Sequence, residues 1–258
     1  MEKEENKKSQ VSVFVIFAII LIVAGGLAYV INRNISEAKS DKEFFASESV
    51  KPGFDSLKNS IQDCMTNTAS DAIELIGIKG GYYNKPKEYF DLGWAFIPYY
   101  YKQGLFLMPA KQEIENQLSM YVDDNIGTCI NNVKKEDFNV VFSKVNTKSE
   151  IEKGDVKFTI DMLVSINKEG KTISLNLKES PVVQNSKLFE IIEIAQYITD
   201  SHKEDPDMIC ISCVAQMARE RQAYVDMVNF DETSNLIIIS ENVSSATPYN
   251  FEFLNKYL

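Results

Sequence analysis

An uncharged apolar run near the N-terminus is the strongest pattern in the chain. Residues 11–31 carry no charged side chain, and the polar side chains among them are Ser12 and Tyr29. At about 1.5 Å of rise per residue, a helix over this run would cross the roughly 30 Å apolar core of a bilayer. A cleaved export signal has an apolar region of only about 7–15 residues. The pattern therefore predicts a retained transmembrane helix, with a signal cleaved near Ala28 as the alternative.

The segments on either side of this run predict a topology. Residues 1–10 form a short cytoplasmic tail in this interpretation, and residues 32–52 form a polar stalk that ends at Pro52. Three Lys or Arg residues lie close to each end of the run, so charge alone does not orient it. The folded part follows the helix, and its cysteines suit an oxidising compartment. We therefore expect a single-pass protein of the cell membrane whose domain faces outside.

Beyond the stalk, apolar residues recur at steps of three and four, the spacing of amphipathic helices. The first such helix covers about 24 residues and ends at Gly80 and Gly81, because glycine favours helix C-termini. Its apolar stripe comprises Phe54, Leu57, Ile61, Cys64, Met65, Thr68, Ala72, Leu75 and Ile76. A second helix opens at Pro109, a residue common in first turns. Its stripe comprises Ile114, Leu118, Tyr121, Val122, Ile126, Cys129 and Val133.

One cysteine lies in each stripe, so two helices packed stripe to stripe bring the sulfurs together. We hypothesise a disulfide between Cys64 and Cys129 that links the helices of a helical subdomain, residues 53–135. On the chain-entropy model, a bridge that closes about 65 residues stabilises the fold by about 4 kcal/mol. The alternative is two buried free thiols that pack as small hydrophobic groups.

The apolar period changes to two after residue 135, and this spacing predicts strands. The expected strands are residues 138–145, 156–166, 173–177, 223–230, 236–240 and 249–254. Turns at residues 167–171 and 231–235 make two hairpins of these strands. Two helices are expected between the hairpins. One starts near Leu188 with Ser186 as its N-cap, and the other runs from Asp205 and Pro206 to about Arg221.

Together these patterns predict an α+β fold. An N-terminal transmembrane helix precedes a helical pair bridged by a disulfide, and a two-layer antiparallel sheet with helices occupies residues 136–258.

Charge and composition exclude several functions. The net charge is −10 and the sequence pI is about 4.8, whereas nucleic-acid binding needs a basic footprint. His202 is the single histidine, so imidazole-based metal sites are not expected. The sequence contains no Gly-x-Ser-x-Gly elbow and no glycine-rich phosphate loop. We therefore expect no enzyme activity, no cofactor and no metal.

Cys210 and Cys213 form the motif Cys-x-x-Cys, which has three interpretations. A helix that starts at Pro206 places Cys210 at its fifth position, too deep for the N-terminal amides to activate the thiol. This placement favours a local disulfide or two buried thiols. Redox activity and a metal half-site are the alternatives.

An aromatic-rich segment connects the two bridged helices. Residues 82–106 are punctuated by glycine and proline, which predicts a loop with one short strand at most. Aromatic side chains with polar tips are typical of recognition surfaces, so a protein or glycan partner outside the cell is one interpretation. The other is that these residues cap a small helical core. The residues in question are Tyr82, Tyr83, Trp94, Tyr99, Tyr100 and Tyr101.

The start of the apolar run resembles pilin-type (class III) signal sequences of archaeal proteins. Gln10 and Ser12 match the Gln-x-Ser opening of those helices, and Phe14 stands where pilins carry a glutamate used in assembly. More broadly, the chain resembles single-span archaeal membrane proteins with a Gln-Val-Ser/Thr start. That resemblance implies an anchored envelope protein and no particular activity.

These observations predict a membrane-anchored, extracytoplasmic binding or structural protein of the cell envelope. Its expected partners are the membrane, through residues 11–31, and a protein or glycan outside. One alternative is a pilin-like subunit that assembles through its N-terminal helix. The other is an envelope thiol–disulfide oxidoreductase that uses Cys210 and Cys213.

Overall fold

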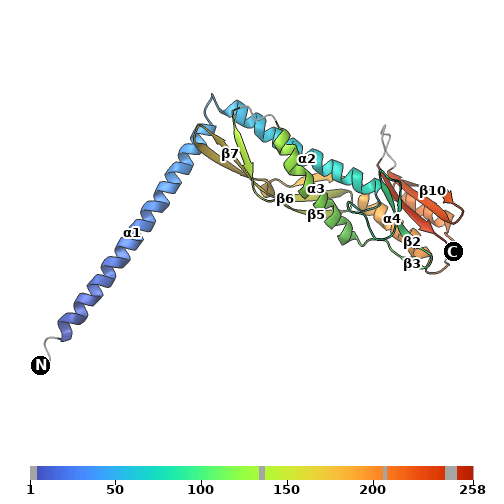
Figure 1. The fold of residues 1–258 in the computed structure, drawn as a ribbon, viewed down its shortest axis with the longest axis horizontal. Helices are drawn as coiled ribbons and strands as arrows, with labels where there is room; N and C mark the ends of the chain where they lie inside the picture. The colour runs from blue at the N-terminus through green and yellow to red at the C-terminus, as the bar shows by residue number, and fades with distance from the viewer. Residues whose placement is uncertain (1–4, 134–136, 206–207, 242–248, 258) are drawn as a thin grey trace.

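A single long helix projects from one end of an elongated body (Figure 1). The computed structural model describes residues 5–133, 137–205, 208–241 and 249–257, with side chains from residue 20 onward except Asn34. The first part of the expected tail, residues 1–4, lies outside the described residues. Helix α1, Glu5–Phe45, contains the apolar run and continues through most of the expected stalk. Among the described residues, no helix is both long and apolar enough to span a membrane.

The C-terminal end of α1, which we call its base, is fixed to the body by packing and by a polar contact. Phe45 is buried, and its ring lies 5.2 Å from that of Phe54 and 6.4 Å from that of Phe138, centroid to centroid. One turn earlier, Asp41 accepts a hydrogen bond from the backbone N–H of Thr172 at 3.1 Å and pairs with Lys171 at 3.1 Å. The helix therefore leaves the body at a position set by its last turns.

Helices α2, Lys51–Ile78, and α3, Lys111–Asn132, confirm the two predicted amphipathic helices. Pro52 lies in the first turn of α2, where its missing N–H costs no hydrogen bond. The two helices pack on each other and lie against the strands (Figure 1), and most of the stripe residues are buried. Gly80 ends the segment with a φ of 50°, and a Cβ there would lie 2.4 Å from the Glu252 carbonyl oxygen. Glycine is thus required by backbone conformation and by space.

The middle of the body is an antiparallel meander that consists of two three-stranded halves. Its strands are β4 (Asn139–Phe142), β5 (Asn146–Glu152), β6 (Asp155–Asp161), β7 (Leu163–Lys168), β8 (Lys171–Asn176) and β9 (Val182–Asn185). Strands β5, β6 and β9 form one half, and β4, β7 and β8 form the other. The single strand predicted over residues 156–166 is wrong, because the chain bends at Met162. The buried Met162 keeps the alternation intact across the bend, so the pattern hides it.

A second sheet closes the far end of the body. It combines β1 (Tyr89–Asp91), β2 (Phe96–Lys102), β3 (Leu105–Phe106), β10 (Ala223–Asp231), β11 (Ser234–Glu241) and β12 (Asn250–Lys256). The order is β1-β2-β12-β11-β10, with β3 on β2, and β2 pairs with β12 in parallel. The predicted second hairpin is therefore confirmed as β10–β11, but the sheet is not purely antiparallel.

The predicted subdomain boundary at residue 135 separates two segments that share a sheet and a core. Strand β2, from the predicted helical subdomain, lies beside β12 from the predicted α+β subdomain, and one hydrophobic core spans both. The junction itself, residues 134–136, lies outside the described residues. The two segments share a core because α2 packs on β9 of the meander and on β12 of the far sheet.

Two further helices cover the strands. Helix α4, Leu188–Ser201, begins near the predicted residue, but its N-cap is Lys187 and not Ser186. Ser186 Oγ still accepts the backbone N–H of Leu188 at 3.1 Å. Helix α5 spans Ile211–Glu220 and packs on β10. The predicted start at Pro206 is wrong. Residues 206–207 lie outside the described residues, and the helix begins five residues later because Cys210 supplies its N-cap.

Candidate functional site

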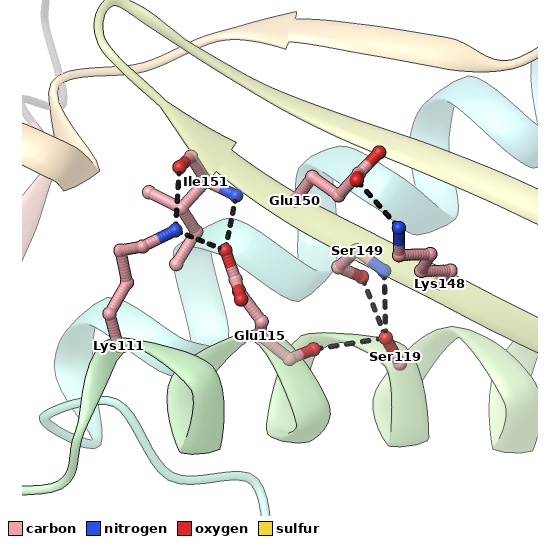
Figure 2. Close-up of polar contacts among 7 residues, drawn as sticks. All are labelled: Lys111, Glu115, Ser119, Lys148, Ser149, Glu150 and Ile151. Carbon is pink, nitrogen blue, oxygen red and sulfur yellow. Dashed lines mark hydrogen bonds and ion pairs between the residues drawn. The ribbon is translucent and has the colours of Figure 1, made fainter.

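A row of polar side chains on α3 faces the edge of strand β5 (Figure 2). Glu115 Oε1 accepts the backbone N–H of Ile151 at 2.9 Å, and Ser119 Oγ accepts that of Ser149 at 3.0 Å. Further along, Asp123 Oδ1 accepts the N–H of Thr147 at 2.8 Å. Lys111 completes the row, because its Nζ donates both to the Ile151 carbonyl and to Glu115.

The spacing explains why the row fits. Four helical residues rise about 6 Å, and two strand residues rise about 6.6 Å. Side chains at every fourth position of α3 therefore meet every second residue of β5. Serine, lysine and carboxylate side chains can do chemistry, but these are held by the backbone of an edge strand. The row serves to satisfy N–H groups that would otherwise template strand addition.

Cys64 and Cys129 form the predicted disulfide. The bridge joins α2 to α3, with the two Cα atoms 5.7 Å apart. Cys64 is buried and Cys129 is half-buried within the packed stripes. The apolar stripes of the two helices therefore predict the correct pairing of these cysteines, and the bridge belongs to the core of the body.

Cys210 and Cys213 also form a disulfide, but in an exposed setting. Cys210 is the N-cap of α5, and its Sγ accepts the backbone N–H of Cys213 at 3.3 Å. Ser212 Oγ lies 3.5 Å from the same sulfur. The prediction that Cys210 is the fifth residue of a helix is therefore wrong. The sulfur sits where N-terminal amides and the helix dipole favour negative charge.

A hollow opens beside this disulfide. It has a volume of about 480 Å³ and is lined by Ile209 and Ile211, which flank Cys210, together with residues of β10 and the following turn. Met208 and Ile211 are 67% and 61% exposed. Asp231 and Glu232 add carboxylates to the lining. The surface around the disulfide thus combines apolar and acidic groups.

Most of the predicted aromatic surface is core. Tyr99, Tyr100 and Tyr101 lie in β2 and are buried, so they cannot contact a partner. The Tyr100 hydroxyl donates to the Gly80 carbonyl at 2.9 Å, and burial raises the pKa of this hydroxyl well above its ordinary value. The ring of Tyr100 stacks on Phe253 at 4.2 Å. The alternative interpretation, that these tyrosines pack against the core, describes them correctly.

The other three aromatic residues differ in exposure. Tyr82 and Tyr83 are half-buried beside α3, where the Tyr83 ring contacts Tyr121 edge to face. Trp94 is 86% exposed at the tip of the β1–β2 hairpin. Asp91 Oδ1 accepts the N–H of Gly93 at 2.7 Å and supports this tip. Of the six residues, Trp94 is therefore the one placed to meet a partner.

The single histidine is packed in the interior of the body. His202 is buried, stacks on Tyr101 at 4.4 Å and lies 3.0 Å, through Nε2, from the side-chain amide of Asn255. Sequence patterns gave no sign of this contact. In the part of the chain that the structure describes, no group of three or more His, Cys, Asp or Glu side chains is placed to hold a metal ion.

Comparisons of the chain with protein-family models, with curated proteins and with solved structures found no match. Functional inference therefore rests on the geometry of the chain itself.

Proposed function

We propose that the chain is a single-span envelope protein that uses α1 as a membrane anchor and presents its body outside as a binding or structural component. The observation that carries this proposal is the exposure of apolar side chains all round α1. Exposed residues in this part of the helix include Ile20, Leu21, Ile22, Val23, Leu27, Val30 and Ile31. A helix that is apolar on every side needs an apolar environment on every side.

The geometry of α1 supports the same role. The helix continues past the apolar run to Phe45, and residues 32–45 would form a rigid stalk of about 20 Å. All four cysteines are paired, as is usual for proteins of oxidising compartments outside the cytoplasm. The far sheet, whose β1–β2 hairpin carries Trp94, then lies at the end of the body opposite the anchor (Figure 1).

Membrane extraction of the full chain tests the anchor. Wild type is expected to stay in the membrane pellet after an alkaline carbonate wash. The double variant Ile22→Arg, Leu27→Arg is expected to move to the supernatant, because each central arginine costs about 2.5–3.5 kcal/mol of insertion free energy. Ile35→Arg is the matched control, since Ile35 is exposed on α1 but lies outside the apolar run, and it should pellet like wild type.

The same apolar helix has a second candidate role, in which copies of the chain cover it in a pilin-like assembly. Wild-type protein that leaves the membrane as a defined oligomer, with crosslinks between cysteines placed at position 22 of two copies, would support assembly and contradict the anchor.

Protease treatment of intact cells tests topology. An outward-facing body is cleaved, and full protection would place it inside.

A further inference from the structure

The Cys210–Cys213 disulfide is expected to add little to the stability of the fold. Its cysteines are 3 positions apart in the sequence, whereas Cys64 and Cys129 are 65 positions apart. A bridge over so short a loop constrains the unfolded chain much less. Both Cys210 and Cys213 are exposed, so thiolates from outside can reach them.

The first turn of α5 stabilises one of the two sulfurs. Cys210 Sγ accepts the Cys213 N–H and lies within 3.5 Å of Ser212 Oγ. When the disulfide opens, these donors and the helix dipole favour a thiolate at Cys210. Helix α5 keeps these donors in position, because its Val214 and Ala218 are buried in the core.

The surroundings indicate the class of substrate. The hollow beside the disulfide has room for several side chains, and the exposed Met208 and Ile211 favour contact with other apolar groups. Asp231 and Glu232 disfavour small anionic thiols. A neutral or basic polypeptide segment that carries cysteines fits this surface best.

We propose that Cys210–Cys213 exchanges its disulfide with a pair of cysteine thiols on a polypeptide substrate. A substrate thiolate attacks Cys210 Sγ. A bond between the two proteins forms while the Cys210–Cys213 bond breaks, and Cys213 leaves as a thiolate that takes up a proton. The second substrate thiolate then attacks the substrate sulfur of this mixed disulfide and expels the stabilised Cys210 thiolate. The substrate loses two electrons and two protons, and the cysteine pair gains both.

This activity goes beyond a binding or structural role and does not depend on the anchor. A chain that fails the carbonate test can still exchange disulfides, and an anchored chain can fail to exchange. The two proposals are therefore tested separately.

A comparison of exchange rates tests the site. Oxidised full-length protein in detergent is mixed with a reduced peptide that carries two cysteines and lysine neighbours, and peptide oxidation is followed by mass spectrometry. The reference is a disulfide-bonded peptide with the sequence of residues 208–217, which lacks the folded helix. The protein is expected to react at least tenfold faster near neutral pH. Equal rates would overturn the proposal.

Two single variants test the role of each sulfur. Cys213→Ser, mixed with the oxidised peptide, should accumulate a mixed disulfide on Cys210. Cys210→Ser should form one at least tenfold more slowly, because Cys213 lacks the N-cap position. Circular dichroism and the urea midpoint should match between the variants, since both lose the same bridge. Equal trapping at both positions would contradict the assignment of Cys210.

Discussion

At the scale of single residues, buried tyrosine hydroxyls couple the stability of the body to alkaline pH. Burial and the nearby charge of Glu113 raise the pKa of Tyr82 to about 12. Burial also raises the pKa values of Tyr100 and Tyr249. The fold thus favours the neutral hydroxyls over the charged forms. Their contribution is complete below the ordinary pKa of about 10 and is lost as pH rises through the folded values.

Tyr82→Phe isolates one of these titrations. The absorbance of tyrosinate, wild type minus variant, is expected to rise with a midpoint near pH 12, because the half-buried hydroxyl resists ionisation. The urea midpoint of wild type should fall as pH is raised above about 10, and less steeply in the variant. A difference midpoint near 10 would show that the hydroxyl is fully solvated.

At the scale of elements, the polar row on α3 covers the edge strand β5 of the meander. Strand β5 is an edge strand of its half of the meander, and Glu115, Ser119 and Asp123 take up three of its N–H groups. Glu115 is only 6% exposed. Without this carboxylate, the backbone N–H of Ile151 would be buried with neither an acceptor nor water. The helix thereby protects an edge that could otherwise pair with another chain.

Ser119→Ala tests this row. The change leaves the Ser149 N–H without its acceptor, and we expect the free energy of unfolding to fall by about 1–3 kcal/mol in urea titrations. Ser60→Ala is the matched control. Both hydroxyls donate to the carbonyl four residues earlier, but the Ser60 bond stays within α2, whereas Ser119 Oγ also accepts the Ser149 N–H of β5. Its variant should change stability by less than about 0.5 kcal/mol. Equal losses would mean that the bond to β5 contributes nothing.

At the scale of the whole molecule, the contact at Asp41 fixes the direction of α1. The Thr172 N–H and the Lys171 ammonium hold the pKa of Asp41 below its ordinary value of about 4. The contact is therefore complete at neutral pH and is lost only as pH falls through this lowered pKa.

Spin labels on α1 and α2 would measure this fixation. With labels at positions 36 and 58, full-length wild type should give a narrow distance distribution at neutral pH and broaden only below about pH 4. Asp41→Ala should be broad at neutral pH. Glu37→Ala should stay narrow, because Glu37 pairs with Arg33 within the same helix. A narrow distribution for Asp41→Ala would assign the fixation to Phe45 alone.

Local periodicity predicted much of this fold, and contacts distant in sequence explain the rest. The stripes of α2 and α3 and the Cys64–Cys129 bridge follow from a helical repeat. The pairing of β2 with β12 does not, because it joins segments about 150 residues apart and β2 is buried on both faces, so it shows no alternation.

The candidate site was half predicted for a similar reason. The Cys-x-x-Cys motif is evident in the sequence, but Asp205 and Pro206 are a stronger conventional start signal than a cysteine N-cap, so the pattern predicts a helix that starts too early. The row on α3 looked like an ordinary polar face. Polar residues at steps of four beside an apolar stripe, as at Glu115, Ser119 and Asp123, are the signal that could have revealed it.

The direction of the long elements also determines how the body bears a load. Helix α2 and the central strands run along the axis from α1 to the far sheet (Figure 1). A pull between the base of α1 and the far end acts along these strands, so their hydrogen bonds must fail together rather than open one after another. The Cys64–Cys129 bridge keeps α2 and α3 from sliding past each other. The body is therefore expected to be stiff in tension along its own long axis, which α1 meets at a bend (Figure 1).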